Sequence, residues 1–212
     1  MNDARIAVIY YSSTGNIHRL AEAYAKGAAD AGAEVRLRKV PELASDAVVD
    51  GVPRWRAHLD ATEHIASATH DDLTWATGYA FGTPTRFGNI SSQLKQFFDT
   101  TSPLWLAGEM ANKPVTGFTG SQDPHGGQES TLLALYQTMY HWGSVVLPPG
   151  WVDYEIAHAA GGNPYGISQV ETQAHDSEYV AAVLAAARHQ GGRLAETARA
   201  LAHLNAAQAS AA

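Results

Sequence analysis

The chain has 212 residues, no cysteine and a formal charge of −7 at neutral pH. The absence of cysteine excludes disulfides, cysteine-ligated zinc, iron–sulfur clusters and thiol catalysis, and the 45% share of hydrophobic residues excludes a wholly disordered chain. No apolar run reaches about 18 residues, so we expect no insertion into a membrane, and the excess of acidic residues argues against a nucleic-acid partner.

The N-terminal residues lead directly into a strand-like segment. No positively charged stretch precedes an apolar one there, so the pattern of a secretory signal peptide is missing, and we expect a cytoplasmic protein. At roughly 150 residues per domain the length predicts a single domain. We place it over residues 1–205, with a flexible tail over residues 206–212.

Strand-like and helix-like segments then alternate along the chain. Residues 5–11 read RIAVIYY, which is typical of a central parallel strand buried on both faces. Ile17, Leu20 and Tyr24 then recur at helical spacing. Further strands are expected over residues 34–40, 79–81, 114–118 and 144–147, and further helices over residues 90–101, 129–142 and 178–204. Five such alternations predict an α/β fold, with a five-stranded parallel sheet covered by helices on both faces.

Two segments show only weak helix or strand periodicity, and we expect them to be insertions in this core. Residues 41–72 are broken by proline and glycine, although Trp55 and Leu59 suggest one short helix. Residues 148–175 are expected to be irregular. Within the long C-terminal helix, Gly191 and Gly192 mark a weak point.

Three loops that follow strands are rich in small polar residues. Ligands bind at the carboxyl ends of the strands in such folds, so these loops should meet at one edge of the sheet. The first loop reads SSTGN and precedes a helix, whose free N–H groups and dipole favour an anion such as a phosphate monoester. It contains no Lys or Arg. The alternative is an ordinary helix cap and turn, for which the same residue types are preferred.

Other nucleotide and catalytic motifs are missing from the sequence. There is no GxxxxGK[ST] phosphate loop, no GxGxxG dinucleotide fingerprint and no GxSxG nucleophile elbow. The ten histidines show no metal-ligand spacing, so we expect no metal site. The second and third loops read GTPTRFGN and TGSQDPHGGQ, and three donor-rich loops at one edge favour a binding site over three unrelated turns.

Six segments together resemble the WrbA family of flavodoxin-like NAD(P)H:quinone oxidoreductases, which use FMN. They are residues 11–17 (YSSTGNI), 81–89 (FGTPTRFGN), 104–108 (LWLAG), 126–129 (GGQE), 141–143 (HWG) and 161–166 (GGNPYG). The resemblance covers nearly the whole chain. It implies a flavodoxin-like, doubly wound three-layer sandwich with strand order 2-1-3-4-5.

The resemblance also implies an FMN site on these loops. The first loop would hold the phosphate, the second would line the isoalloxazine ring, and the third would contact its pyrimidine side. The implied residues are Ser12, Ser13, Thr14, Gly15, Asn16 and Ile17 for the phosphate, Pro84, Thr85, Arg86, Phe87, Gly88 and Asn89 beside the ring, and Thr119, Gly120, Ser121, Gln122, Asp123 and Gly126 at the pyrimidine side.

His141 and Trp105 are implied to lie near the open flavin face, from neighbouring subunits of a homo-oligomer, either a dimer or a tetramer. Trp105 would stack on a quinone and His141 would donate a hydrogen bond to it. The alternatives are a core aromatic at a helix end for Trp105 and a histidine satisfied at a helix C-terminus for His141. Thr14 occupies the place of a nicotinamide-contacting residue in the family. Asp123 is expected to face solvent, because a carboxylate near the flavin would disfavour its reduced anionic form.

Two functions follow as hypotheses. The first is an NAD(P)H dehydrogenase that reduces quinones by two electrons, with hydride passing through flavin N5 in ping-pong order, NADH or NADPH serving as the donor. The alternative is a flavodoxin-type one-electron carrier that docks on redox partner proteins. A protein-binding scaffold that touches DNA is disfavoured, because no basic patch is apparent.

Overall fold

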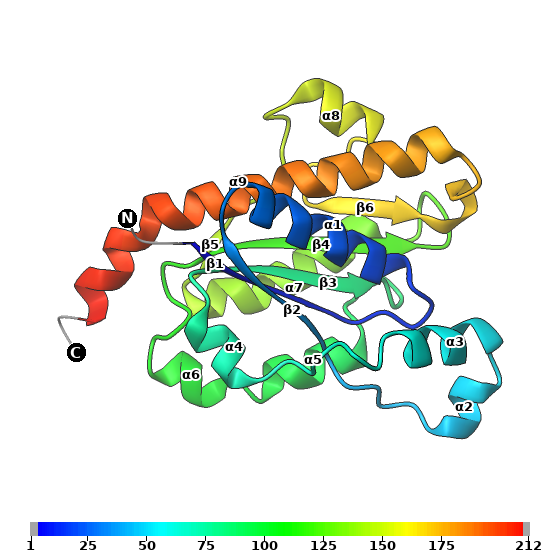
Figure 1. Cartoon of the computed structure of the whole chain (residues 1–212), viewed down its shortest axis with the longest axis horizontal. Helices are drawn as coiled ribbons and strands as arrows, with labels where there is room; N and C mark the ends of the chain where they lie inside the picture. The colour runs from blue at the N-terminus through cyan, green and yellow to red at the C-terminus, as the bar shows by residue number, and fades with distance from the viewer. Residues whose placement is uncertain (1–3, 210–212) are drawn as a thin grey trace.

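A single parallel sheet forms the centre of the molecule. The computed structural model describes residues 4–209, and side chains as far as residue 204. The strands are β1 (Arg5–Tyr10), β2 (Glu34–Lys39), β3 (Gly78–Pro84), β4 (Pro114–Ser121), β5 (Val145–Val146) and β6 (Ile167–Val170). Their order is β2-β1-β3-β4-β5, and all pairs are parallel (Figure 1). The predicted doubly wound fold and strand order are confirmed.

The edge of the sheet beyond β4 differs from the five-stranded prediction. The first two residues of β4 pair with β5, whereas its second half, from Phe118 to Ser121, pairs with β6. Residues 148–175 are therefore not wholly irregular: they contain α8 (Tyr154–Ala159), β6 and the short 3₁₀ helix η1 (Glu171–Gln173). The four residues of β6 are too few and too polar to be recognised as a strand from their hydrophobic periodicity. Their position in the sheet is set by pairing with β4.

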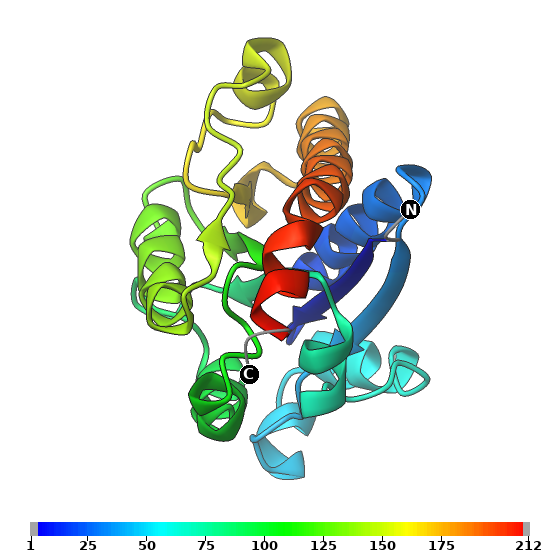
Figure 2. The same cartoon turned by 90° about the vertical axis from the view of Figure 1, so that its left-hand side faces the viewer.

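Helices cover both faces of the sheet (Figure 2). One face is covered by α1 (Asn16–Asp30) and α9 (Ser177–Ala209), and the other by α4 (His70–Trp75), α5 (Ser92–Asp99) and α7 (Gln128–Trp142). Consecutive residues of β1 serve the two faces in turn: Ile6 and Val8 join the core under α1 and α9, while Ala7 and Ile9 join the other core. This alternation explains why the strand reads as a continuous apolar run.

Close helix packing explains the first of the two adjacent glycines in α9. A Cβ atom on Gly191 would lie 2.2 Å from the carbonyl oxygen of Tyr24, and one on Gly27 would lie 1.9 Å from that of Arg188. Gly27 and Gly191 thus let α1 and α9 approach each other closely. The helix continues through both glycines to Ala209, inside the tail expected from residue 206, and residues 210–212 lie outside the described part.

The first insertion, residues 41–72, is largely helical. It contains α2 (Asp46–Asp50) and α3 (Pro53–Ala61), and it reaches the start of α4. The short helix suggested by Trp55 and Leu59 is α3. The remaining short helix, α6 (Ser102–Leu106), follows α5. Among the described residues, no helix is both long and apolar enough to cross a membrane.

Candidate functional site

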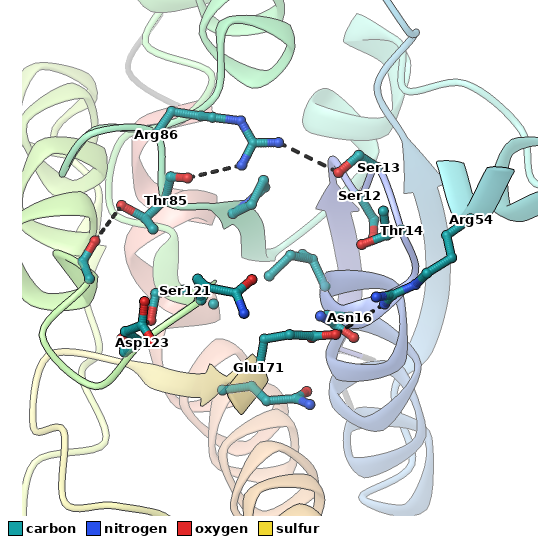
Figure 3. A pocket seen from close by; sticks show the side chains of 16 residues that line it. Ser12, Ser13, Thr14, Asn16, Arg54, Thr85, Arg86, Ser121, Asp123 and Glu171 are labelled. Carbon is teal, nitrogen blue, oxygen red and sulfur yellow. Dashed lines mark hydrogen bonds and ion pairs between the residues drawn. The ribbon is translucent and has the colours of Figure 1, made fainter. Parts of the chain in front are cut away.

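The three polar loops meet in one pocket at the carboxyl edge of the sheet. Its volume is about 400 Å³, and Figure 3 shows the side chains that line it. It is lined by Ser12, Ser13, Thr14, Asn16, Ile17, Arg54, Pro84, Thr85, Arg86, Gly120, Ser121, Gln122, Asp123, Gly126, Gln169 and Glu171. Thirteen of these sixteen residues belong to the predicted set, so the structure brings the three predicted loops together around one pocket.

The first loop presents the N-terminus of α1 to this pocket. Gly15 caps the helix in the left-handed region, with φ 102°, and its N–H donates to Ser12 Oγ at 3.0 Å. Gly15 itself does not line the pocket; its role is to turn the chain so that Thr14 and Asn16 do. Free N–H groups at a helix start, flanked by hydroxyl and amide groups, suit an anionic ligand group.

The second loop is held in a tight turn. Arg86 and Asn89 exchange backbone hydrogen bonds of 2.8 and 3.0 Å, and Phe87 and Gly88 between them have positive φ angles of 54° and 77°. Thr85 Oγ1 receives a hydrogen bond of 2.8 Å from Thr131. The turn places Thr85 and Arg86 on the pocket. Phe87, Gly88 and Asn89 do not line it, and Phe87 is fully exposed.

The third loop is organised around the backbone carbonyl of Asp123. This oxygen accepts hydrogen bonds from Ser121 Oγ at 2.6 Å and from Gln128 Nε2 at 3.0 Å. The Asp123 residue is exposed, as expected. Thr119 does not line the pocket: it is buried within β4, where its hydroxyl donates to the Thr83 carbonyl at 2.7 Å.

Three pocket residues were not predicted, and all come from the two weak-signal segments. Arg54 lies in the first turn of α3, while Gln169 lies on β6 and Glu171 immediately after it. Gln169 is only 2% exposed, and among the described residues its Nε2 and Glu171 Oε2 have no hydrogen-bond partner. The sequence around these three residues shows no clear helix or strand periodicity, so it did not indicate a binding role. Gln169 and Glu171 reach this edge of the sheet because β6 pairs with β4.

This pocket fits FMN on chemical grounds. It combines a helix N-terminus for a phosphate with hydroxyl and amide groups from three loops. The unsatisfied donor of Gln169 and acceptor of Glu171 match the hydroxyl groups of a ribityl chain, which both donate and accept. Buried polar groups without partners are costly, so a polar ligand at this position would remove that cost.

A second, larger pocket of about 720 Å³ adjoins the first and shares Arg86 with it. It is lined by Tyr11, Trp55, Arg86, Asn89, Ile90, Ser92, Gln93, Lys95, Ala134, Gln137, Thr138 and His141. His141 therefore lies on the second pocket, beside the loop pocket rather than in it. Trp105 lines neither pocket, but its indole N–H donates to the His141 carbonyl at 2.7 Å. Since Trp105 is 47% exposed, it is not a core aromatic.

Two tyrosines and a histidine behind the first loop have shifted pKa values. Burial raises the pKa of Tyr11 strongly, and its hydrogen bond to Glu42 raises it further. Burial also raises the pKa of Tyr10, with a further contribution from Glu22. Burial, followed by the charges of His18 and Lys39, lowers the pKa of His58 to about 4. These groups are therefore neutral at pH 7 and add no charge behind the loop.

Comparison with known proteins identifies the family. Residues 4–159 match the family model described as NADPH-dependent FMN reductase. A Deinococcus radiodurans protein named NAD(P)H dehydrogenase (quinone) is 46% identical over 164 residues, covering 77% of this chain and 82% of the relative. A protein of the same name from Geotalea daltonii is 40% identical, covering 92% and 96%.

Solved structures agree with this assignment. The crystal structure of a flavodoxin, WrbA-like protein from Agrobacterium tumefaciens aligns with a TM-score of 0.65 and 26% identity, covering 94% of this chain and 99% of that one. An archaeal flavodoxin, at 16% identity and a TM-score of 0.58, shares the fold. The chain therefore belongs to the family described as NADPH-dependent FMN reductase, and is a WrbA-like oxidoreductase of flavodoxin fold whose cofactor is FMN.

Proposed function

We propose that this enzyme reduces quinones by two electrons at the expense of NADH or NADPH, in ping-pong order. The observation that carries the proposal is the junction of two pockets at Arg86: a donor-rich pocket that suits FMN, and beside it a wider pocket with aromatic walls. The names of the two relatives described above support quinone as the acceptor.

In this proposal the loop pocket holds the cofactor. Ser12, Thr14 and Asn16 at the start of α1 bind the phosphate, while Thr85 and Arg86 lie along the ring and the 120–123 loop contacts its pyrimidine edge. Bound FMN supplies a hydride acceptor that can pass two electrons onward. The protein's contribution is to orient the ring and to leave one face open to both substrates in turn.

The second pocket receives the substrates. His141 lines it at the last turn of α7 and is placed to donate a hydrogen bond to a quinone oxygen. The hydrogen bond from Trp105 to the His141 carbonyl fixes the indole ring at the exposed end of this region. Because Trp105 is exposed and lines neither pocket of its own chain, we propose that it stacks on a quinone at a neighbouring subunit of a homo-oligomer.

Steady-state kinetics of the purified FMN-loaded protein test the proposal. NAD(P)H oxidation is measured while benzoquinone is varied at several fixed donor concentrations. Parallel double-reciprocal lines and rates well above those of free FMN are expected. Intersecting lines would overturn the ping-pong order, and rates equal to those of free FMN would overturn the proposed activity.

The same purified protein can be used to test the alternative function, a one-electron carrier. Anaerobic photoreduction of a carrier would accumulate the one-electron-reduced protein in high yield. For a two-electron reductase we expect full reduction with little of that form. High accumulation together with slow quinone turnover would favour the carrier.

A further inference from the structure

An ion pair spans the pocket between two segments that are far apart in the sequence. Arg54 Nη2 lies 3.0 Å from Glu171 Oε1, which joins the start of α3 to the turn after β6. Figure 3 shows the Arg54 side chain reaching across to Glu171 beside Asn16 of the first loop. The pair therefore stands at the anion-binding end of the pocket.

The loop at that end supplies no cation of its own. Arg86, the other cation that lines the pocket, lies on the second loop, where its guanidinium donates to the Thr85 carbonyl and to Ser13 Oγ. Figure 3 places Arg86 and Arg54 on separate edges. A phosphate at the start of α1 carries nearly two negative charges, and the guanidinium of Arg54 is a positive group on the Asn16 side of that position (Figure 3).

Arg54 is free to change partners. Its side chain is 65% exposed, whereas that of Glu171 is 22% exposed. The exposed guanidinium of Arg54 can therefore leave this ion pair for another anion without losing its contact with water. A bidentate hydrogen bond from arginine to phosphate is stronger than a single contact with a carboxylate.

The Glu171 carboxylate is the unexpected member of the pair, because it places a negative charge where an anionic ligand is proposed to bind. Its Oε2 is buried and has no partner among the described residues, as is also true of Nε2 of Gln169, which lines the same pocket. A carboxylate at a phosphate-binding end opposes the anion through its charge. Its placement makes sense if it holds Arg54 in position before the cofactor arrives.

We propose that Arg54 is a cofactor-specificity residue, which exchanges its ion pair with Glu171 for the phosphate of FMN. The insertion that carries α3 thereby supplies the charge that the first loop lacks. Glu171 keeps Arg54 over the pocket in the absence of cofactor and competes with the phosphate for it. The consequence is a preference for FMN over riboflavin, which has the same ring and ribityl chain without the phosphate.

Titration of the cofactor-free protein with FMN and with riboflavin, followed by quenching of flavin fluorescence, tests this exchange. Arg54→Gln is expected to raise the Kd of FMN by about tenfold, because a hydrogen-bonded charge is lost, and to leave the Kd of riboflavin within about twofold. Raising the salt concentration should shrink the difference. Arg188→Gln removes an exposed arginine of α9 that lines neither pocket and serves as the matched control.

Glu171→Gln tests the competing half of the exchange. It should lower the Kd of FMN by about threefold in the native background and have no such effect when Arg54 is already glutamine, since the two residues are coupled. Thermal unfolding of each variant confirms that it is folded. The proposal would be overturned if Arg54→Gln weakened the binding of FMN and riboflavin equally, or left the binding of FMN unchanged. It would also be overturned if Glu171→Gln bound FMN more weakly than the native protein.

Discussion

The hydroxyl of Tyr11 donates a hydrogen bond of 2.7 Å to the carboxylate of Glu42, 31 residues further along the chain. The same carboxylate accepts hydrogen bonds from Trp55 Nε1 at 3.0 Å and from Gln93 Nε2 at 2.9 Å. The three donors all line the second pocket, although Glu42 does not. One acceptor thus joins the end of β1, the inserted helix α3 and the start of α5 into a single wall.

Replacing Glu42 by alanine should therefore destabilise the protein by about 1–3 kcal/mol, because three part-buried donors lose their acceptor at once. Urea unfolding measures this loss. Glu196→Ala, which removes an exposed carboxylate from α9, should change stability far less. Similar stability for the two variants would contradict the role given to Glu42.

We expect His58 to contribute to the loss of unfolding free energy at acidic pH. Its pKa of about 4 in the folded protein lies below the ordinary value of 6.5, owing to burial and to the charges of His18 and Lys39. The unfolded chain then takes up the proton first, so this contribution is complete above about pH 6.5 and is lost as the pH falls towards 4. His58→Gln should flatten that part of the curve.

Urea midpoints measured between pH 4 and 7 check this slope. His175→Gln, at an exposed histidine, is the control and should keep the native slope. Because His58 lies next to Gly15, at 3.5 Å from the position of a Cβ there, FMN retention should fall over the same pH range. A native slope in His58→Gln would show that other groups dominate.

The two neighbouring glycines of α9 should respond oppositely to alanine. Gly191→Ala places a methyl group 2.2 Å from the Tyr24 carbonyl oxygen and should cost about 1–3 kcal/mol through overpacking. Gly192→Ala meets its nearest atom, the Gly27 carbonyl oxygen, at 3.6 Å, and should gain up to about 1 kcal/mol through helix propensity. Thermal unfolding of both variants decides whether α1 and α9 are as close as described.

Loss of the Trp105 ring should affect turnover rather than cofactor binding. Trp105→Ala is expected to lower kcat/KM for benzoquinone by up to about tenfold, the value of an aromatic contact, and to leave the FMN content unchanged. Trp105→Phe should retain most of the activity. Trp151→Ala, at an aromatic residue that is half-exposed and lines neither pocket, is the control; a similar loss there would remove the special role of Trp105.

The position of the site could be predicted because it depends on strands that read clearly in the sequence. Apolar runs placed β1, β3 and β4, and the residues after them had to emerge at one edge of a parallel sheet. Ser12, Thr85 and Ser121 follow directly from that rule, and the structure brings them together.

The remaining residues of the site depend on tertiary contacts that local patterns do not encode. Arg54 reaches the pocket because α3 is tied through Trp55 to Glu42, and nothing near Arg54 in the sequence indicates that attachment. Gln169 is placed by the pairing of a four-residue strand with β4. Phe87 shows the converse: it stands within the most distinctive loop, yet the positive φ of its turn directs it to solvent.

The division of one sheet position between β5 and β6 also determines when the pocket can form. Gln169 and Glu171 reach the pocket when β6 pairs with β4, and β6 follows α7, β5 and α8 in the chain. On a ribosome, the loops after β1, β3 and β4 emerge well before β6, and pairing across such a long separation is slow. A chain released before β6 would therefore contain the first loop but lack Gln169 and Glu171, and we expect it to bind the cofactor more weakly than the full chain does.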